Sequence, residues 1–123
     1  MKEKNRILVV DDESSFRATL SAQLKGEGYS VSSAEDGDIA IEMLRSQYFD
    51  LILLDLEMPN VDGYGVLTYV KKKHPGTKVI ILTGFADLKN ALDSKGLGAD
   101  CFVSKPFDRA DLFSTIERVL GNY

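Results

Sequence analysis

Short apolar or β-branched runs alternate with longer amphipathic segments along the whole chain, and this alternation limits the possible fold more than any other feature. The runs lie at residues 7–10, 29–32, 51–54, 79–82 and 101–103. Runs without polar alternation are typical of strands that are covered on both faces. Each run is followed by a segment whose apolar residues recur at helical spacing, which predicts a helix after each strand.

The apolar residues of the expected helices fall on one face of each helix. They are Phe16, Leu20 and Leu24; Ile39, Ala40, Met43 and Leu44; Val66, Leu67 and Val70; Leu112, Ile116, Val119 and Leu120. The segment 86–95 has a weaker stripe. Strands that alternate with helices are parallel and are joined by right-handed crossovers. We therefore predict an α/β fold, a doubly wound five-stranded parallel sheet in a single domain over residues 1–123.

Length and charge exclude several classes of protein. A chain of 123 residues fits one domain with its own core. The net charge of −4 gives no bulk attraction to nucleic acid. The single cysteine, Cys101, excludes an internal disulfide, and apolar runs of four residues are too short to span a bilayer. Because the N-terminus is charged and lacks a signal-like apolar segment, we expect a cytoplasmic protein.

Chemically functional side chains come directly after four of the expected strands. Asp11 and Asp12 follow the first strand and Asp55 follows the third, while Thr83 and Lys105 follow the fourth and fifth. Ligands of open α/β sheets bind at the carboxyl ends of the strands. If the first and third strands are neighbours, the three carboxylates meet at this edge of the sheet.

Crowded carboxylates favour a cation. Two carboxylates ~4 Å apart repel by about 4 kcal/mol at an effective dielectric constant of 20, so the group binds a cation or takes up protons. Oxygen ligands of this kind suit Mg²⁺, which also contacts phosphate oxygens. An ammonium and a hydroxyl bind phosphate, and an aspartate can attack phosphorus.

Each of these residues also has an ordinary structural interpretation when taken alone. An aspartate after a strand is usually a turn former or a helix cap. The pair Lys105–Pro106 is compatible with a rigid turn and nothing more. The coincidence of all five side chains at one edge of the sheet favours a site for phosphoryl transfer.

The sequence around these positions resembles the receiver domain of two-component response regulators, from Ile7 to about Leu120. The matching segments are LVVDDE (8–13), AEDG (34–37), DLILLDLEMP (50–59), DG (62–63), ILTG (81–84), GAD (98–100) and KPF (105–107). The resemblance implies a flavodoxin-like (βα)5 fold with strand order 2-1-3-4-5. It also implies a phosphorylation-dependent signalling switch, whose only catalysis is its own Mg²⁺-dependent phosphorylation and dephosphorylation.

The resemblance assigns a role to each acidic position. Asp55 matches the phospho-acceptor, which takes a phosphoryl group from a sensor histidine kinase or a histidine phosphotransfer protein. Asp12 matches the direct ligand of Mg²⁺, and Asp11 matches the acid that reaches the ion through water. The backbone carbonyl of Glu57 completes the ligands from the protein.

The resemblance also assigns a switch. Thr83 and Lys105 match the groups that bind phosphoryl oxygens, and Phe102 matches the switch aromatic, although packing in the core explains that residue nearly as well. Phosphorylation is expected to shift the surface formed by the fourth and fifth strands and the helices that follow them. Glu57 and Phe85 stand at variable positions that influence how long the phosphoryl group lasts.

Two other functions compete with this interpretation. Phosphatases of the haloacid-dehalogenase type also use an aspartate, Mg²⁺, a threonine and a lysine. They carry a second aspartate two residues after the nucleophile, where this chain has Glu57. A scaffold that binds partners without phosphorylation is disfavoured by the intact set of site residues. The sequence names neither the partner kinase nor the downstream target, and it leaves open a monomer or a phosphorylation-dependent dimer that contacts neither nucleic acid nor membrane.

Overall fold

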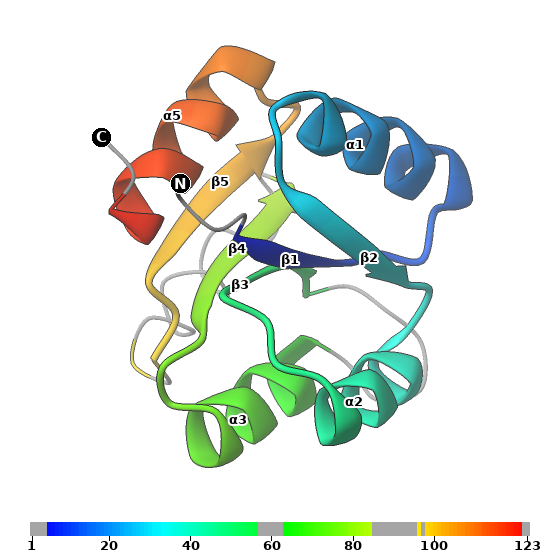
Figure 1. The fold of residues 1–123 in the computed structure, drawn as a ribbon, viewed down its shortest axis with the longest axis vertical. Coiled ribbons are helices and arrows are strands. Elements are labelled where there is room, and N and C mark those ends of the chain that lie inside the picture. The colour runs from blue at the N-terminus through cyan, green and yellow to red at the C-terminus, as the bar shows by residue number, and fades with distance from the viewer. Residues whose placement is uncertain (1–4, 57–62, 85–95, 97, 122–123) are drawn as a thin grey trace.

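A parallel β-sheet lies between two pairs of helices in the computed structural model, which describes residues 5–56, 63–84, 96 and 98–121 (Figure 1). The strands are β1 (Arg6–Val10), β2 (Ser30–Ala34), β3 (Leu51–Asp55), β4 (Lys78–Gly84) and β5 (Cys101–Lys105). The helices are α1 (Ser14–Gly26), α2 (Gly37–Ser46), α3 (Gly63–Lys73) and α5 (Arg109–Leu120). All strand pairs are parallel and the order is β2-β1-β3-β4-β5. The predicted doubly wound fold and its strand order are confirmed.

Four of the strands extend further toward their carboxyl ends than the predicted runs indicated: β2, which ends at Ala34, and the three strands that follow it. β3 includes Asp55, β4 continues to Gly84, and β5 ends with Lys105. The ladder continues because its hydrogen bonds join backbone groups and do not depend on side-chain polarity. Two of the candidate site residues are thus the last residues of strands rather than the first residues of loops. The helix predicted at 86–95 lies outside the described residues.

The central strands divide their side chains between two cores. In β1, Ile7 and Val9 pack with α1 and α5, whereas Leu8 and Val10 pack with α2 and α3. We call these clusters the α1/α5 core and the α2/α3 core, after the helices that cover each face of the sheet (Figure 1). Alternation of this kind follows from the two-residue period of a strand.

Burial on both faces holds for the central strands but not for the edges of the sheet. Every residue of β3 is buried, while β5 is half-buried throughout and β2 is largely exposed or half-buried. An edge strand has a neighbour on one side only, so water reaches its backbone and part of its side chains. Coverage on both faces, which the continuous apolar runs of four residues predicted, therefore holds for β1 and β3, whereas the shorter or alternating runs became the edge strands β2 and β5.

Most residues of the predicted helical stripes face the cores, but the prediction was wrong for Ile39 of α2, which is 38% exposed, while Ile41 of the same helix packs against the α2/α3 core. Leu20 and Leu24 of α1 are buried, as are Leu112 and Ile116 of α5. Phe16, the first residue of the α1 stripe, is half-buried against the α1/α5 core. None of the described helices is both long and apolar enough to cross a membrane.

Gly63, the first residue of α3, brings that helix into close contact with the end of β3. A Cβ atom at this position would lie 2.6 Å from the carbonyl oxygen of Asp55 and 2.6 Å from the Cα atom of Leu56. Real Cβ atoms do not approach backbone this closely, so a side chain here would displace the strand end that carries Asp55. The glycine thus couples the position of α3 to that of the candidate acceptor.

We expect Gly63→Ala to lower the free energy of unfolding by about 1–3 kcal/mol, because the added methyl group overpacks a backbone contact. Urea unfolding followed by circular dichroism measures the change. Gly26→Ala is the matched control, since a Cβ at Gly26 meets nothing within 4 Å. Equal stability of the Gly63→Ala variant and the parent protein contradicts the tight contact.

Candidate functional site

Three carboxylates meet at the carboxyl edge of the sheet. Oxygens of Asp11, Asp12 and Asp55 all lie within 4.8 Å of one another. The parallel register explains the meeting: Val10 of β1 pairs with Leu54 of β3, and an aspartate follows each of them. Because β1 and β3 are neighbours in the sheet, aspartates that are 43 and 44 residues apart in sequence are brought to the same edge.

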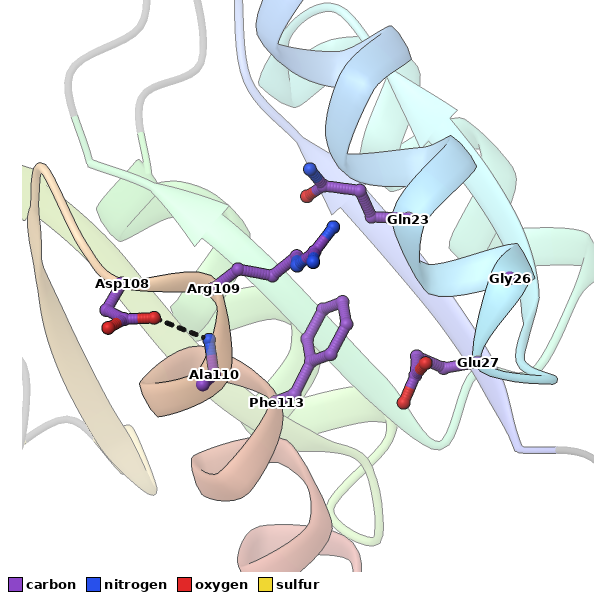
Figure 2. Close-up of a pocket in the computed structure, with 7 residues that line it drawn as sticks. All are labelled: Gln23, Gly26, Glu27, Asp108, Arg109, Ala110 and Phe113. Atoms are coloured by element: carbon purple, nitrogen blue, oxygen red, sulfur yellow. Dashed lines mark hydrogen bonds between the residues drawn. The ribbon is translucent and has the colours of Figure 1, made fainter.

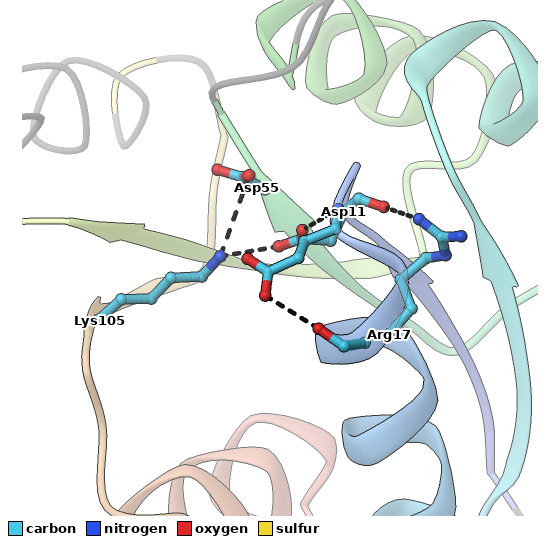
Figure 3. A network of polar contacts seen from close by, with 6 residues as sticks. Asp11, Arg17, Asp55 and Lys105 are labelled. Carbon is cyan, nitrogen blue, oxygen red and sulfur yellow. Dashed lines mark hydrogen bonds and ion pairs between the residues drawn. The ribbon is translucent and has the colours of Figure 1, made fainter.

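Asp11 is the most firmly held of the three. Only 1% of its surface is exposed. One carboxylate oxygen accepts a hydrogen bond from the backbone N–H of Glu13 (2.9 Å), and the other is 2.7 Å from the ammonium of Lys105. Its main-chain carbonyl accepts a third bond, 2.7 Å long, from the guanidinium of Arg17 (Figure 3). With both carboxylate oxygens engaged, Asp11 is fixed in position before any ligand arrives.

Lys105 is the cation that faces this cluster. Its Nζ atom lies 2.7 Å from Oδ2 of Asp11 and 3.9 Å from Oδ2 of Asp55 (Figure 3). The side chain of Lys105 is 28% exposed, whereas those of the two aspartates are 2% and 11% exposed. The ammonium therefore stands between two buried carboxylates and reduces their mutual repulsion.

The charge balance of the cluster suits a divalent cation. Three carboxylates and one ammonium leave a formal excess of two negative charges. Opposite ligands of Mg²⁺ are about 4 Å apart, because each lies about 2 Å from the ion. The spacing of the three carboxylates is close to this span, and Asp12 is exposed and open to solvent. The donor set thus fits Mg²⁺, and Asp12 is the exposed carboxylate of the three.

Of the remaining predicted site residues, the structure describes Thr83 and Phe102 but not Glu57 and Phe85. Thr83 lies in β4 and pairs with Ser104 of β5 in the register, at the same edge of the sheet as the acidic cluster. Phe102 is half-buried and packs against the α2/α3 core, which agrees with its structural interpretation and leaves the switch role a prediction. Glu57 and Phe85 lie outside the described residues, so their predicted roles stay predictions.

Two contacts at the site were not predicted from the sequence. Phe16 was assigned only to the apolar stripe of its helix, yet the Lys105 ammonium lies 4.3 Å from the centroid of its ring. Arg17 was given no role, yet it binds the main chain of Asp11. The sequence feature that pointed to these two residues was their location in the first turn of α1, shortly after Asp11 and Asp12. That location says that they are near the site but not which atoms they reach.

A separate recess lies between α1 and α5 (Figure 2). Its lining residues are Gln23, Gly26, Glu27, Asp108, Arg109, Ala110 and Phe113. Asp108 caps α5 by accepting a hydrogen bond from the N–H of Ala110 (2.8 Å). The residues from α1 belong to or follow its last two turns, whereas the acidic cluster precedes its first turn. We therefore assign the chemistry to the acidic cluster and not to this recess.

Comparison with known proteins identifies a related family. The family model described as "Response regulator receiver domain" matches residues 7–117. A probable transcriptional regulator ycf27 of Porphyridium aerugineum is 39% identical over 118 residues, which are 96% of this chain and 49% of that protein. The transcriptional regulatory protein ZraR of Escherichia coli is 38% identical over 94% of this chain and 26% of its own length. The chain therefore spans about half, or about a quarter, of these curated relatives.

Solved structures share the fold. A CheY-like response regulator receiver domain protein from Methanospirillum hungatei has a TM-score of 0.92 and 33% identity, covering 97% of this chain and 95% of its own. The receiver domain of NtrX from Brucella abortus has a TM-score of 0.89 and 32% identity, covering 95% and 99%. In both cases nearly the whole of the other chain is matched.

We expect Lys105→Met to lower the free energy of unfolding by about 1–3 kcal/mol without Mg²⁺, because a buried oxygen of Asp11 loses its donor. Adding Mg²⁺ should then stabilise the variant more than it stabilises the parent, since no ammonium opposes the ion. Thermal unfolding with and without Mg²⁺ measures both effects.

Lys71→Met is the matched control, because Lys71 forms a comparable ion pair with Asp100 (3.0 Å) outside the acidic cluster. This variant should lose stability but respond to Mg²⁺ as the parent does. The same increment from Mg²⁺ in Lys105→Met and in the parent contradicts competition between the ammonium and the ion.

Proposed function

The chain belongs to the response regulator receiver family, and on that basis we propose that it is a phosphorylation-dependent switch in which Asp55 accepts a phosphoryl group. The observation that carries the proposal is the position of Asp55, which ends the buried strand β3 within an acidic cluster and lies 3.9 Å from the Lys105 ammonium. A nucleophilic oxygen, a cation for the incoming phosphoryl oxygens and a donor set for a divalent ion are thus gathered at one point.

The proposed reaction is a transfer between partners. A carboxylate oxygen of Asp55 attacks the phosphorus of a phosphohistidine on a sensor histidine kinase or a histidine phosphotransfer protein. The P–N bond breaks, the imidazole leaves with its electron pair and takes a proton, and Asp55 becomes an acyl phosphate. Bound Mg²⁺ supplies charge neutralisation for the phosphoryl oxygens.

The other residues of the site are proposed to bind the metal ion or to neutralise the charge of the phosphoryl group. We assign Asp12, Asp55 and the backbone carbonyl of Glu57 to direct contact with the metal. Asp11 is assigned to contact through a water molecule. Support for the indirect role of Asp11 comes from its two occupied oxygens. Lys105 lies close enough to Asp55 for its ammonium to contact a phosphoryl group built on that carboxylate.

We expect the protein to gain one phosphoryl group when it is incubated with acetyl phosphate and Mg²⁺, and Asp55→Asn to gain none. Intact mass spectrometry measures the gain. Asp38→Asn is the matched control, since Asp38 is an exposed carboxylate in the first turn of α2. An unmodified parent contradicts the proposal, and sustained turnover of a phosphate ester favours the phosphatase alternative.

Phosphorylation is proposed to act on the surface formed by β4, the following helix, β5 and α5. Thr83 moves toward the phosphoryl group, and Phe102 follows into the space that is vacated. A shift of a two-state equilibrium from 1:99 to 99:1 needs about 5.5 kcal/mol. Two charge-assisted hydrogen bonds to the phosphoryl group, at about 1.5–3 kcal/mol each, come close to this amount. Phe102 is half-buried against the α2/α3 core.

We expect Thr83→Ala to bind Mg²⁺ and beryllofluoride, a phosphoryl analogue, while the amide resonances of β5 and α5 shift less than in the parent. The reason is that the hydroxyl which links the phosphoryl group to the surface is gone. NMR spectra of the amides measure the shifts. The exposed Thr68 offers the control variant Thr68→Ala, and shifts in Thr83→Ala as large as those of the parent contradict the switch role.

The setting of this switch is also part of the proposal. We place residues 1–123 in one receiver unit that works in the cytoplasm, where ATP supplies the phosphohistidine of the partner. Its relatives named as transcriptional regulators are two to four times as long as the matched segment, which supports a role in controlling an output function. The unit itself acts as a monomer or a phosphorylation-dependent dimer, without direct contact with nucleic acid or membrane.

A further inference from the structure

We infer that Phe16 is a positioning residue whose ring holds the Lys105 ammonium beside the acceptor Asp55. The inference rests on the proposed function, because it assigns Phe16 a part in the binding of the phosphoryl group. The side chain of Phe16 lies outside the acidic cluster, in the first turn of α1. Phe16 acts through Lys105 alone.

The contact between the two side chains has the geometry of a cation–π interaction. The Nζ atom of Lys105 lies 4.3 Å from the centroid of the Phe16 ring, well inside the range of about 6 Å over which a ring attracts a cation. The same atom lies 2.7 Å from Asp11 and 3.9 Å from Asp55. The ammonium is thus bounded by carboxylates and by an aromatic ring.

The ring is itself held in place. Phe16 lies in the first turn of α1 and packs against the α1/α5 core. Its ring meets that of Phe107 edge to face, with centroids 6.0 Å apart and an interplanar angle of 75°. Phe16, Lys105, Pro106 and Phe107 together line one apolar recess beside the acidic cluster. A ring fixed in this way gives the ammonium a fixed partner.

A fixed partner matters because lysine is flexible. The side chain of Lys105 has four rotatable bonds and is 28% exposed, so solvent and several rotamers compete with its place at the site. Without a further partner, the ammonium would be drawn toward Asp11 and away from Asp55, because its distance to Asp11 is shorter by 1.2 Å. The ring adds attraction from another element and keeps the ammonium within reach of a phosphoryl group on Asp55.

An aliphatic side chain cannot replace the ring. Leucine fills similar space and remains apolar, but it lacks the negative face that attracts a cation. A cation–π contact of a partly exposed ammonium corresponds to a two- to fivefold change in affinity (roughly 0.5–1 kcal/mol). We therefore expect Phe16→Leu to bind beryllofluoride about two- to fivefold more weakly than the parent at saturating Mg²⁺, and Phe16→Tyr to bind it as the parent does.

A double-mutant cycle tests whether Phe16 acts through the ammonium. Beryllofluoride affinity at saturating Mg²⁺ is measured for the parent, Phe16→Leu, Lys105→Met and the double variant. The loss caused by Phe16→Leu should disappear in the Lys105→Met background, because no cation remains for the ring to hold. A loss of the same size in both backgrounds, or an equal loss in Phe16→Tyr, overturns the inference.

An NMR measurement distinguishes an effect of Phe16 on the position of Lys105 from an effect on the stability of the protein, and it needs no phosphoryl analogue. The ring current of Phe16 should shift the ε-methylene proton resonances of Lys105 upfield in the parent and in Phe16→Tyr, and this shift should vanish in Phe16→Leu. Urea unfolding of each variant provides the control for folding. Unshifted lysine resonances in a folded parent overturn the inference. Failure of the parent to bind beryllofluoride with Mg²⁺ instead counts against the proposed function.

Discussion

Repulsion among carboxylates at the end of a buried sheet is the constraint on which the site depends. Asp11 and Asp55 are almost completely buried, and with Asp12 they bring three negative charges within 4.8 Å. The structure tolerates this arrangement because Lys105 supplies one positive charge and the backbone of Glu13 supplies a hydrogen bond. The remaining negative charge favours the binding of a divalent cation at this edge of the sheet.

The hydrophobic core keeps this unfavourable cluster in place. β1 and β3 are almost completely buried, and each delivers an aspartate to the same edge. Tight packing resists the outward movement that would relieve the repulsion. Gly63 tightens the arrangement further by bringing α3 against the backbone of Asp55 and Leu56. The energy of the core thus maintains a geometry that the charges alone oppose, which is typical of sites built for chemistry.

The half-buried edge of the sheet links the acidic cluster to the opposite face of the sheet. β5 carries both Lys105 and Phe102, and none of its residues is fully buried. Lys105 faces the acidic cluster, whereas Phe102 packs against the α2/α3 core on the opposite face. One short strand thus has a side chain at the site and another on the opposite face of the sheet. The aromatic pair Phe16 and Phe107 borders the site on the side of α1 and packs against the α1/α5 core.

The sequence by itself determined the alternation of the described strands and helices, the parallel sheet and the polar side chains at its carboxyl edge, because apolar runs and helical stripes reflect local periodicity and burial. It also indicated which aspartates would meet, since parallel neighbours end at one edge. Only the tertiary structure decided that Lys105 lies closer to Asp11 than to Asp55, that Arg17 binds a main-chain carbonyl, and that Phe16 holds an ammonium from a residue 89 positions away. Such contacts depend on rotamers and on the packing of α1 against β5, which no local pattern encodes.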